Sequence, residues 1–540
     1  MSASSKKKLR KEQEAAKLTE KQLTAQKEAK KNNLYTTLFV VVMAAILVVA
    51  AVIGVKQTIT TSGIREKNTV ALTVGEHELN SVEMNYFFMD AVNNFYSSYG
   101  SYAAMFGLDV SKPLNEQFLD EESGLTWADD FMASAQESAA SIYALADAAK
   151  AAGFTLPEAE QELLESNMTS LDLYAAMYGY GDANSYLKAM YGNGASKESF
   201  RAYNELQALA SAYYNHYADS LTYEAADLRA AEADNFGAYS SYSFNTYYLA
   251  VSRFLNGGTT DENGNTTYSE EENAAAEKAA EEAAKALTGE EVTDADALDA
   301  AIASLEINKD TTAASTYNED TLYSSLNATY KDWLTSADRK TGDVAYFPST
   351  SGDTVSGFHV VMYQGSNDNL FSLKNVRHIL VAPAHEHAEG ETHEEGETYS
   401  AEELAAAKAT AEEILASWKA GEATEESFAS LANEKSADGD GVSGGLYENV
   451  YPGQMVADFE DWCYASGRKS GDTGIVETEY GYHVMYFVGN SQQNYRDYLI
   501  ENELRSADLN AWYTEIIAAM TQTEGNTKYV RQDLVLGAAQ

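Results

Sequence analysis

The sequence predicts an α+β protein: a helical lobe and two α/β modules of one kind, preceded by a single transmembrane helix. Three observations lead to this fold class. An uncharged apolar run occupies residues 34–55, a thirteen-residue motif occurs at 331–343 and again at 460–472, and strand-like runs flank an Ala/Glu-rich helical segment at 401–420. Apolar residues that recur with strand or helix periodicity give the type of each element.

The membrane segment is the run from Leu34 to Val55, 22 residues without a charge. At 1.5 Å per residue this run can span a bilayer, and it is longer than the apolar core of a cleavable signal. Residues 1–33 hold ten Lys or Arg and four Glu, a net charge of +6. Basic residues stay inside, so we expect a signal anchor rather than a cleaved signal. The protein is then a single-pass cell-membrane protein with a cytoplasmic tail (1–33) and an extracellular large domain.

The charge of the remaining chain restricts its partners. The whole chain carries −46, and removing the basic tail leaves −52 for the exterior part. This argues against nucleic acid and against anionic lipid as partners, and favours a solvated domain that attracts cationic unfolded chains. The only cysteine, Cys463, excludes an intrachain disulfide. It lies beside Trp462 on the apolar face of a predicted helix, so we expect a buried small residue rather than a nucleophile.

The helical lobe is predicted over residues 70–240. Val70 to Leu79 reads as two short strands around Gly75, and helices follow from Ser81 to Phe236. The apolar stripes of these helices are either the core of a bundle or an adaptable apolar cradle for other chains, because Met and Tyr suit both uses. They are rich in aromatic residues and methionine: Tyr86, Phe87, Phe88, Met89, Tyr174, Met177, Tyr178, Tyr186, Met190 and Tyr191.

An internal repeat sets the architecture of the remainder. Residues 331–343 and 460–472 are identical at six of thirteen positions, and a strand-like run follows each, at 358–363 and at 482–486. Repeats of this size indicate two copies of one folding unit. We therefore predict a first module over 241–366 and a second over 374–490.

The second module contains two buried strands, 376–381 and 481–487, each with one inward-facing histidine, His378 and His483. Between them lie the helix at 401–420, a shorter helix around Phe428 and the loop Ser436-Ala-Asp438. A Gly444-Gly445 turn comes next, and then the segment Gln454-Met455-Val456 leads to Phe459.

This order of motifs, over about 115 residues, resembles the parvulin-type prolyl isomerases, and most of all the extracytoplasmic PrsA/SurA foldases. The resemblance implies a parvulin fold and a cofactor-free isomerase. It assigns catalysis to His378, Asp438 and His483, and substrate binding to Met455, Phe459, Thr478 and Gln454, with Thr478 also supporting the paired histidines.

The residues themselves fit that chemistry. Met455 and Phe459, four apart on one helical face, can form an apolar cup for a proline ring. His378 and His483, on neighbouring strands, can share a hydrogen bond and fix each other's tautomers. The alternative is a pair of core histidines that hold two strands together. The sequence departs from the family after Gly445, where Leu446-Tyr447 replaces Asp-Leu-Gly and changes the active-site loop.

The first module is predicted to lack this site. Tyr248 stands where the second module has His378, and neither a Gly-Gly turn nor a Gln-Met-x-x-x-Phe segment occurs. His359 remains and is expected to be a core residue, so this module is structural or peptide-binding. An acidic insert at 256–272 is predicted to be a solvated loop.

Two segments complete the prediction. His385, His387 and His393, among glutamates, could ligate Zn²⁺ or Cu²⁺, but the composition is that of a solvated loop, so we predict adventitious binding and no metal site. A last helix at about 494–520 lies in a C-terminal segment, 491–540. By resemblance to the SurA-like chaperone lobe, this segment folds back to complete the N-terminal lobe.

The sequence thus predicts a membrane-anchored extracytoplasmic foldase. It would isomerise X–Pro bonds in newly secreted proteins and hold unfolded clients. A non-catalytic holdase whose modules only bind peptide is the alternative, and an acidic metal-buffering surface protein is a third possibility supported only by the His/Glu insert. The sequence names no client and gives no oligomeric state.

Overall fold

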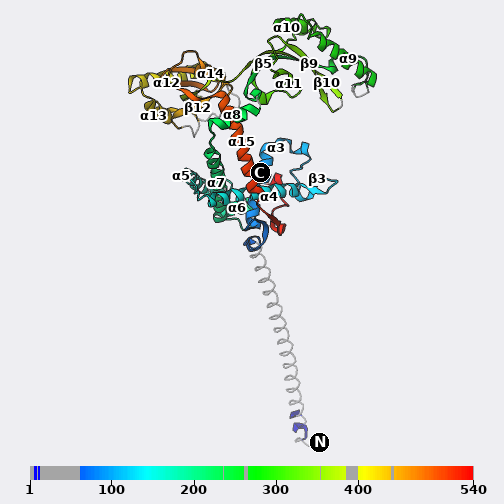
Figure 1. Ribbon diagram of the computed structural model, residues 1–540. Helices are drawn as coiled ribbons and strands as arrows, with labels where there is room; N and C mark the ends of the chain where they lie inside the picture. Colours follow the sequence, from blue (N-terminus) through cyan, green and yellow to red (C-terminus); the bar gives the residue numbers. More distant parts are fainter. Residues whose placement is uncertain are drawn as a thin grey trace. The chain divides into compact units, whose positions relative to one another are not determined.

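The computed structural model describes residues 5–8, 10–11, 61–234, 236–260, 266–352, 354–384, 399–438 and 443–538. The chain divides into two compact units: Met1–Leu221 with Asp508–Gln540, and Thr222–Ala507 (Figure 1). The predicted transmembrane run at 34–55 lies outside the described residues. Within the part of the chain that is described, no helix is both long and apolar enough to cross a bilayer.

The first unit is mainly helical, and its small sheet has the strand order β15-β1-β2. The strands predicted around Gly75 are present, and β15 of the C-terminal segment pairs with β1, with Glu524 opposite Leu72. The first unit includes the C-terminal segment from Asp508 onward. The elements are α2 (Ile64–Lys67), β1 (Val70–Val74), β2 (His77–Asn80), α3 (Ser81–Tyr99), β3 (Phe118–Asp120), β4 (Leu125–Thr126), α4 (Trp127–Ala151), α5 (Glu158–Met177), α6 (Ala183–Tyr191), α7 (Lys197–Ser220) and β15 (Gln522–Glu524).

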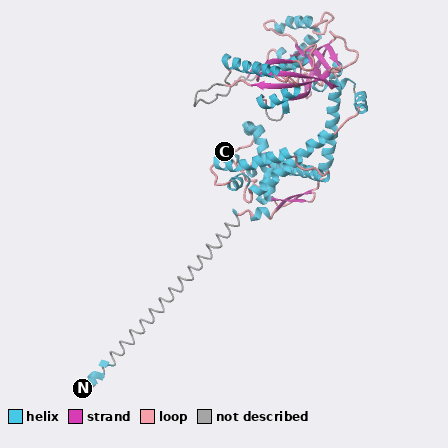
Figure 2. Ribbon diagram, turned by 90° about the vertical axis from the view of Figure 1, so that its left-hand side faces the viewer, coloured by secondary structure: helices cyan, strands magenta, loops and turns pink. Residues whose placement is uncertain are grey.

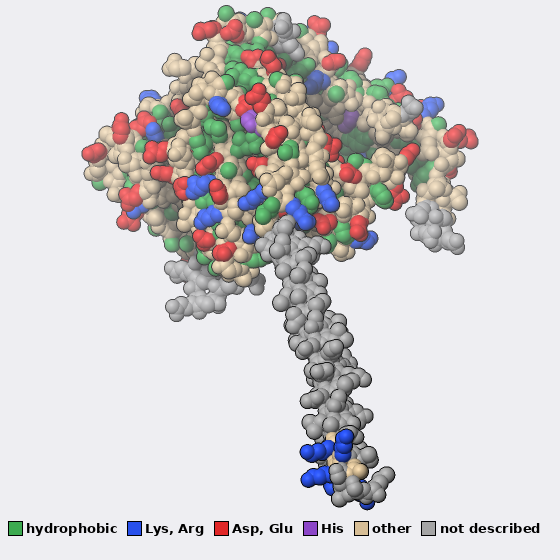
Figure 3. All heavy atoms as spheres, turned by 90° about the horizontal axis from the view of Figure 1, so that it is seen from below, with side chains coloured by type: hydrophobic (Ala, Val, Ile, Leu, Met, Phe, Trp, Pro, Cys, Tyr) green, Lys and Arg blue, Asp and Glu red, His purple; other side chains and the backbone are tan. Residues whose placement is uncertain are grey.

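The aromatic stripes of this unit divide into two groups. Tyr86, Phe87 and Phe88 on α3 are at most 1% exposed and form the core of the unit. On α5, by contrast, Met177 and Tyr178 are 64% and 63% exposed. Hydrophobic side chains reach the surface in several places among the carboxylates (Figure 3). The bundle-core reading therefore holds for α3, whereas the end of α5 presents apolar side chains to solvent.

The second unit holds most of the strands (Figure 2). Its first module has an antiparallel sheet of order β8-β5-β10-β9, and α9 packs against β10. The module and the helix before it comprise α8 (Ala225–Asp234), β5 (Ser241–Ala250), β6 (Thr259–Thr260), β7 (Thr266–Thr267), α9 (Glu270–Ala286), α10 (Ala295–Ser304), β8 (Thr316–Leu322), α11 (Lys331–Leu334), β9 (Val344–Ser351) and β10 (Thr354–Asn367).

The second module has a sheet of order β12-β11-β14-β13. When the sheet strands of each module are numbered along the chain, both sheets have the order second, first, fourth, third. In both modules two helices follow the first of these strands and one follows the second. The internal repeat predicted from the sequence is therefore confirmed. The elements are β11 (Ser372–Val381), α12 (Ala401–Ala420), α13 (Glu425–Lys435), β12 (Leu446–Val450), α14 (Ala457–Tyr464), β13 (Thr473–Thr478) and β14 (Gly481–Asn494), and α15 (Tyr495–Ala518) follows.

The conserved motif of the repeat makes the same contacts in both modules. Arg339 lies over the Trp333 ring at 4.8 Å, and Arg468 lies over Trp462 at 3.6 Å. The Gly-Asp turn that follows pairs with the last strand through equal hydrogen bonds: Gly342 N to Tyr363 O, 2.8 Å, and Gly471 N to Phe487 O, 2.9 Å. Tyr363 and Phe487 are therefore equivalent positions, and counting back along the strand makes His359 equivalent to His483.

Strand register corrects the expected counterpart of His378. His378 lies opposite Met485, and the equivalent of Met485, Val361, lies opposite Thr246. Thr246 rather than Tyr248 thus occupies the position of His378. The prediction was wrong by two residues, because it aligned the two modules by distance along the sequence. Cross-strand pairing, not distance along the sequence, decides which side chains meet.

The insert at 256–272 also differs from the expected loop. It contains the short hairpin β6–β7, with Thr260 opposite Thr266, and its end is the first turn of α9, which Ser269 caps by accepting a hydrogen bond from Glu272 N. Ser followed by Glu three residues later is a capping box, and it starts the helix earlier than the composition suggested. Residues 261–265 lie outside the described part.

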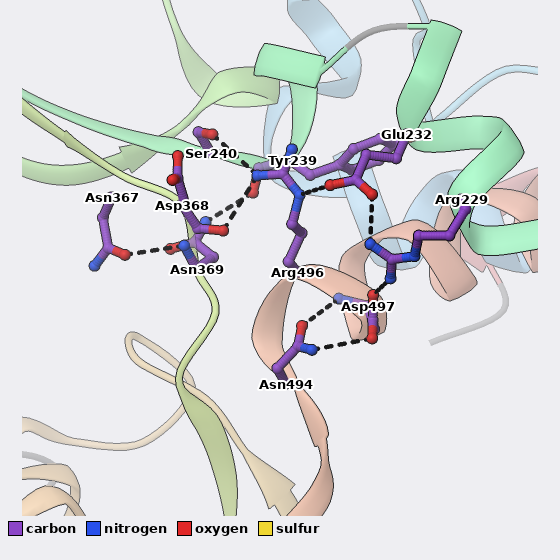
Figure 4. A network of polar contacts seen from close by, with 10 residues as sticks. All are labelled: Arg229, Glu232, Tyr239, Ser240, Asn367, Asp368, Asn369, Asn494, Arg496 and Asp497. Atoms are coloured by element: carbon purple, nitrogen blue, oxygen red, sulfur yellow. Dashed lines mark hydrogen bonds and ion pairs between the residues drawn. The ribbon is translucent and has the colours of Figure 1, made fainter. Parts of the chain in front are cut away.

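Arg496 at the start of α15 joins four segments of the second unit (Figure 4). Its guanidinium is 1% exposed, pairs with Glu232 of α8 at 2.6 Å and donates to Ser240 Oγ and to Asp368 O. Arg229 pairs with both Glu232 and Asp497. A buried guanidinium needs such partners. These contacts attach α8 to the second unit, which explains why the first unit ends at Leu221 whereas the lobe was expected to end at 240.

Candidate active site

The two buried histidines of the second module lie on one face of its sheet. In the antiparallel pair β11–β14, Leu380 is opposite His483 and His378 is opposite Met485. Alternate residues of a strand share a face, so both rings point to the same side. His378 is 3% exposed and His483 is 5% exposed, which confirms the prediction that both face inward.

A continuous chain of hydrogen bonds passes through the pair. Thr478 Oγ1 lies 2.9 Å from His483 Nε2, the two Nδ1 atoms of His483 and His378 are 2.9 Å apart, and His378 Nε2 lies 2.8 Å from Asp438 Oδ2. The structure thus brings together four residues assigned from the sequence. Strand pairing alone placed the histidines, whereas Asp438 comes from the loop after α13.

With Asp438 ionised, this geometry fixes the direction of every hydrogen bond. A carboxylate only accepts, so His378 donates from Nε2, and its Nδ1 is then the acceptor for Nδ1–H of His483. Nε2 of His483 is left without a proton and accepts from the Thr478 hydroxyl. The tautomers of both rings therefore follow from the charge on Asp438.

Both imidazoles are neutral at pH 7. Burial and, to a smaller extent, the neighbouring His378 lower the pKa of His483 to about 4, and Asp438 opposes these effects. Burial also lowers the pKa of His378, against the attraction of Asp438 for its charged form. A neutral pair in a dry site can hold hydrogen bonds of fixed direction without burying a net charge.

Phe459 covers the pair. It is 3% exposed, and its ring meets both imidazoles edge-on, each with a centroid distance of 5.4 Å and an angle of 85°. Met455 packs on the same apolar cluster. However, α14 begins at Ala457, so Met455 lies in the turn before the helix, and the expectation that both residues share one helical face is wrong.

Gln454 is the predicted site residue that the structure uses differently. It is exposed, and its Oε1 accepts a hydrogen bond from Tyr451 N at 3.1 Å, which closes the turn before α14. Within the described residues, it makes no contact with the two histidines. Its place in substrate binding stays a prediction.

The loop that carries Asp438 is fixed to the strand of His378. Ser436 Oγ accepts from Leu380 N at 3.0 Å and from Asp438 N at 3.2 Å, and Ala437 N donates to Leu380 O at 2.8 Å. The turn at Gly445 has φ of 63°, and a Cβ there would lie 2.1 Å from His378 O. Only glycine can combine a positive φ with so close an approach to a backbone carbonyl. The turn therefore needs glycine at 445 in order to pack against the backbone of His378.

Tyr447 is the site residue that sequence reasoning missed. Its hydroxyl donates to Asp438 Oδ2 at 2.9 Å, and its ring centroid lies 5.1 Å from that of His378. Burial, together with the nearby carboxylate, raises the pKa of Tyr447 to about 12, so the phenol keeps its proton. The signal was present in the sequence as the departure Leu446-Tyr447 after the Gly-Gly turn.

The corresponding face of the first module has different chemistry. Thr246 Oγ1 accepts from Asn318 Nδ2 at 3.2 Å, and His359 lies against the rings of Tyr248 (4.8 Å) and Tyr330 (5.6 Å). Among the described residues, the His359 ring has no hydrogen-bond partner. Tyr330 immediately precedes the repeated motif, as Phe459 does, and Leu326 stands four residues before it, as Met455 does. An apolar cup is thus retained without a histidine pair or a carboxylate.

The remaining candidates concern metals and the cysteine. The His/Glu insert with His385, His387 and His393 lies outside the described residues. No cluster of three or more potential metal ligands occurs in the described part of the chain. Cys463 is 1% exposed, and burial raises the pKa of its thiol to about 12. It is a core residue of α14, as predicted.

Comparison with known proteins identifies the second module. Residues 378–489 match the family described as "Rotamase: PPIC-type PPIASE domain". Foldase protein PrsA 1 of Listeria innocua is 34% identical over 113 residues, which covers 19% of this chain and 37% of that protein, and the protein of the same name from Listeria monocytogenes matches equally. The second module is therefore a parvulin-type peptidyl-prolyl cis-trans isomerase domain.

Solved structures of similar proteins include PrsA from Bacillus subtilis, with 26% identity, 27% of this chain, 48% of that chain and a TM-score of 0.18. PrsA from Bacillus cereus has 24% identity, and the match covers 28% of this chain and 49% of that chain with a TM-score of 0.18. A structure from the description of the SurA-like chaperones PEB4 and Cj1289 of Campylobacter jejuni has 16% identity. The match covers 39% of this chain and 71% of that chain with a TM-score of 0.14. The chain spans little more than a third of the length of the curated relatives that it matches.

Proposed function

We propose that this protein is a membrane-anchored extracytoplasmic foldase that isomerises X–Pro bonds in secreted proteins and holds unfolded clients. The observation that carries the proposal is the ordered chain Thr478–His483–His378–Asp438 beneath Phe459, within a domain of the rotamase family. The relatives are foldases by name, and clients of the same kind are proposed for this chain.

The reaction requires little covalent chemistry. Rotation about a peptide bond meets a barrier of about 20 kcal/mol, because resonance gives the bond double-bond character. X–Pro is the bond with both isomers populated, and its uncatalysed exchange takes tens of seconds or longer. A catalyst needs an apolar seat for the proline ring and a dry site that disfavours the planar, charge-separated amide.

Each part of the site has a role in this scheme. Phe459 and Met455 seat the pyrrolidine ring, and the neutral histidine pair forms the dry floor. The Asp438 carboxylate acts on the twisted amide of the transition state. In that state the carbonyl group and the nitrogen are no longer conjugated. Because Asp438 is only partly buried, with a side chain 29% exposed, it can reach a bound peptide.

The first module is proposed to be a parvulin-like copy that is structural or binds peptide without isomerising it. Thr246 and Asn318 take the positions where the second module has His378 and Tyr447, and the Asn318 amide donates to Thr246 Oγ1 and to backbone carbonyls rather than to a carboxylate. The apolar cup formed by Leu326 and Tyr330 supports peptide binding more than catalysis.

The membrane anchor is proposed from the uncharged run at 34–55 and the basic tail before it. Lys6, Lys7, Lys8, Arg10 and Lys11 of this tail are exposed, and their side chains gather at the N-terminal stretch (Figure 3). The positive-inside tendency then puts the tail in the cytoplasm and residues from Lys56 onward outside the cell.

A non-catalytic holdase is the second candidate. It is favoured by the apolar side chains that the helical unit exposes: Met105 is 81% exposed, Leu173 is 69% exposed, and Met177 and Tyr178 exceed 60%. Exposed apolar surface of this kind is typical of interaction sites. A holdase would slow aggregation of an unfolded client without changing the rate of proline-limited refolding.

Refolding of a protein limited by proline isomerisation separates the two candidates. We expect catalytic amounts of the full chain to accelerate the slow phase, and the Asp438→Asn variant to lose this acceleration while it still suppresses aggregation. Suppression of aggregation without any acceleration by the natural chain would establish the holdase instead. For the topology, protease added to intact cells should remove the large domain and leave a small membrane-bound fragment.

A further inference from the structure

Tyr447 belongs to the strand next to that of His378. In the β11–β12 pair it lies opposite Val376, so its side chain is on the face that carries His378. Tyr447 lies two residues after the Gly444-Gly445 turn, and the closeness of this turn to the backbone of His378 fixes where β12 begins. Its phenol is therefore held beside the Asp438 loop by two rigid elements.

The Asp438 carboxylate receives two hydrogen bonds on one oxygen. Tyr447 OH lies 2.9 Å from Oδ2, and His378 Nε2 lies 2.8 Å from the same atom. Within the described residues, Oδ1 has no partner. Two donors that approach Oδ2 from neighbouring strands fix the rotation of the carboxylate, and they leave Oδ1 as the atom that can face a substrate.

The first module shows that this arrangement is not a requirement of the fold. At the position opposite Phe244, the equivalent of Val376, it has Asn318, and the amide of Asn318 donates to Thr246 rather than to a carboxylate. The module that has the Asp438 carboxylate therefore also has a tyrosine at this strand position, and the module without the carboxylate has Asn318 there.

We propose that Tyr447 is a positioning residue of the isomerase site, which holds Asp438 through Oδ2 so that Oδ1 acts on the prolyl amide, and whose ring walls the proline seat. This inference rests on the proposed isomerase function and deepens it. Tyr447 touches Asp438 and His378 and acts through them, since the reacting atoms belong to the substrate and to the carboxylate.

The phenol is one of the two side-chain donors that hold the Asp438 carboxylate. The titratable groups that face Asp438 in the described residues are His378 on β11 and Tyr447 on β12, with His483 on β14 behind His378. Removal of the hydroxyl leaves the imidazole as the sole side-chain donor to Asp438 among the described residues, so the rotation of the carboxylate is less restricted.

The test is Tyr447→Phe in the full chain, which keeps the ring and removes the hydroxyl. We expect kcat for an X–Pro peptide to fall about 3- to 10-fold, the range for the net loss of one typical hydrogen bond, with KM unchanged. The matched control is Tyr464→Phe, because the Tyr464 hydroxyl donates to Val450 O at 2.8 Å and does not touch Asp438.

A second readout is the ¹⁵N spectrum of histidine, which is practical because the chain has only eight histidines. In the natural chain His378 should show the Nε2–H tautomer, and in Tyr447→Phe its titration midpoint should shift, whereas Tyr464→Phe should leave it in place. These spectra report on the hydrogen bond whether or not peptide is turned over.

The outcomes separate the two proposals. A natural chain that accelerates exchange, together with a Tyr447→Phe variant of unchanged kcat and histidine spectrum, overturns the role of Tyr447 and leaves the isomerase function intact. A fall in kcat without a change in the histidine spectrum makes Tyr447 a packing residue and overturns positioning. A natural chain without isomerase activity overturns the proposed function, and this role of Tyr447 with it.

Discussion

The two α/β modules share one sheet order, the same helix placement and the same Trp-Arg and Gly-Asp contacts, yet they present different chemistry on one face of the sheet. In the second module that face carries two histidines joined to Asp438. In the first module, the equivalent positions hold Thr246 and His359, and His359 is surrounded by aromatic rings. The comparison teaches that the repeated residues maintain the fold, whereas a few side chains on β5 or β11 and on the following loop decide whether a polar site exists.

The largest expected effect separates the modules directly. His378→Ala should reduce X–Pro isomerisation to near background, because Asp438 loses one of its two side-chain donors and Nδ1 of His483 loses its partner. It should also cost about 1–3 kcal/mol of unfolding free energy for the buried groups left unpaired. Thr246→Ala is the matched change in the first module, because Thr246 occupies the position of His378, and it should leave the activity unaltered. Exchange kinetics beside thermal melts of both variants give the answer, and a similar loss in both would end the distinction.

The next effect isolates the charge. Asp438→Asn keeps the shape of the side chain and removes its charge, so we expect kcat to fall about 10- to 100-fold with little change in KM, as for a group that acts on the transition state. The melting temperature should stay close to that of the natural chain because the side chain is partly exposed. Steady-state kinetics of the folded variant give the answer. Full activity in this variant would show that Asp438 has no part in the mechanism.

A pH effect on stability should be present in both modules. An unfolded histidine titrates near pH 6.5, whereas folded His483 titrates near about 4. Between these values the unfolded chain binds more protons, so the unfolding free energy falls as pH is lowered through this window and levels off below it. Burial lowers the pKa of His359 in the same direction.

Denaturant melts at several pH values for His483→Gln and His359→Gln separate the two contributions. Each variant should flatten part of the pH dependence. The account expects the larger share from His483, because a second imidazole lies against it. A flat profile in the natural chain between pH 6.5 and 4 would show that the pair is not buried as a neutral unit.

The smallest effect concerns the two apolar cups. Met455→Ala should raise KM for an X–Pro peptide several-fold and change kcat little, since it removes part of the proline seat used equally in ground and transition states. Leu326→Ala, its counterpart, should leave KM unchanged and cost about 2–5 kcal/mol of stability, because Leu326 is 5% exposed. Calorimetry and steady-state kinetics distinguish these outcomes, and a kcat loss in Met455→Ala would place Met455 in the chemistry.

Much of the fold could be predicted because its signals are local. The helix at 401–420 and the strands around His378 and His483 follow from periodicity, and the repeat at 331–343 and 460–472 gave two copies of one unit. Pairing across strands is not local. The equivalence of Thr246 with His378 depends on register, which the sequence offset did not contain.

The site was predicted as far as motif spacing reaches. The resemblance to the parvulin family assigned His378, Asp438, His483 and Thr478 to the site, and the structure brings these residues into one hydrogen-bond chain. Tyr447 was visible only as a departure from the family pattern, and its partner could not be known before β12 and the Asp438 loop were placed side by side. Met455 was assigned to the helix because a four-residue interval suits α14, yet the turn that Gln454 closes comes first.

The most direct test is the cis/trans exchange rate of an X–Pro peptide with catalytic amounts of full chain carrying paired substitutions in one module at a time. The account predicts that His378→Ala with Asp438→Asn abolishes the acceleration, and that Thr246→Ala with His359→Ala preserves it. Acceleration that survives the first pair, or disappears with the second, would contradict the conclusion that one of two modules with the same fold carries the isomerase site.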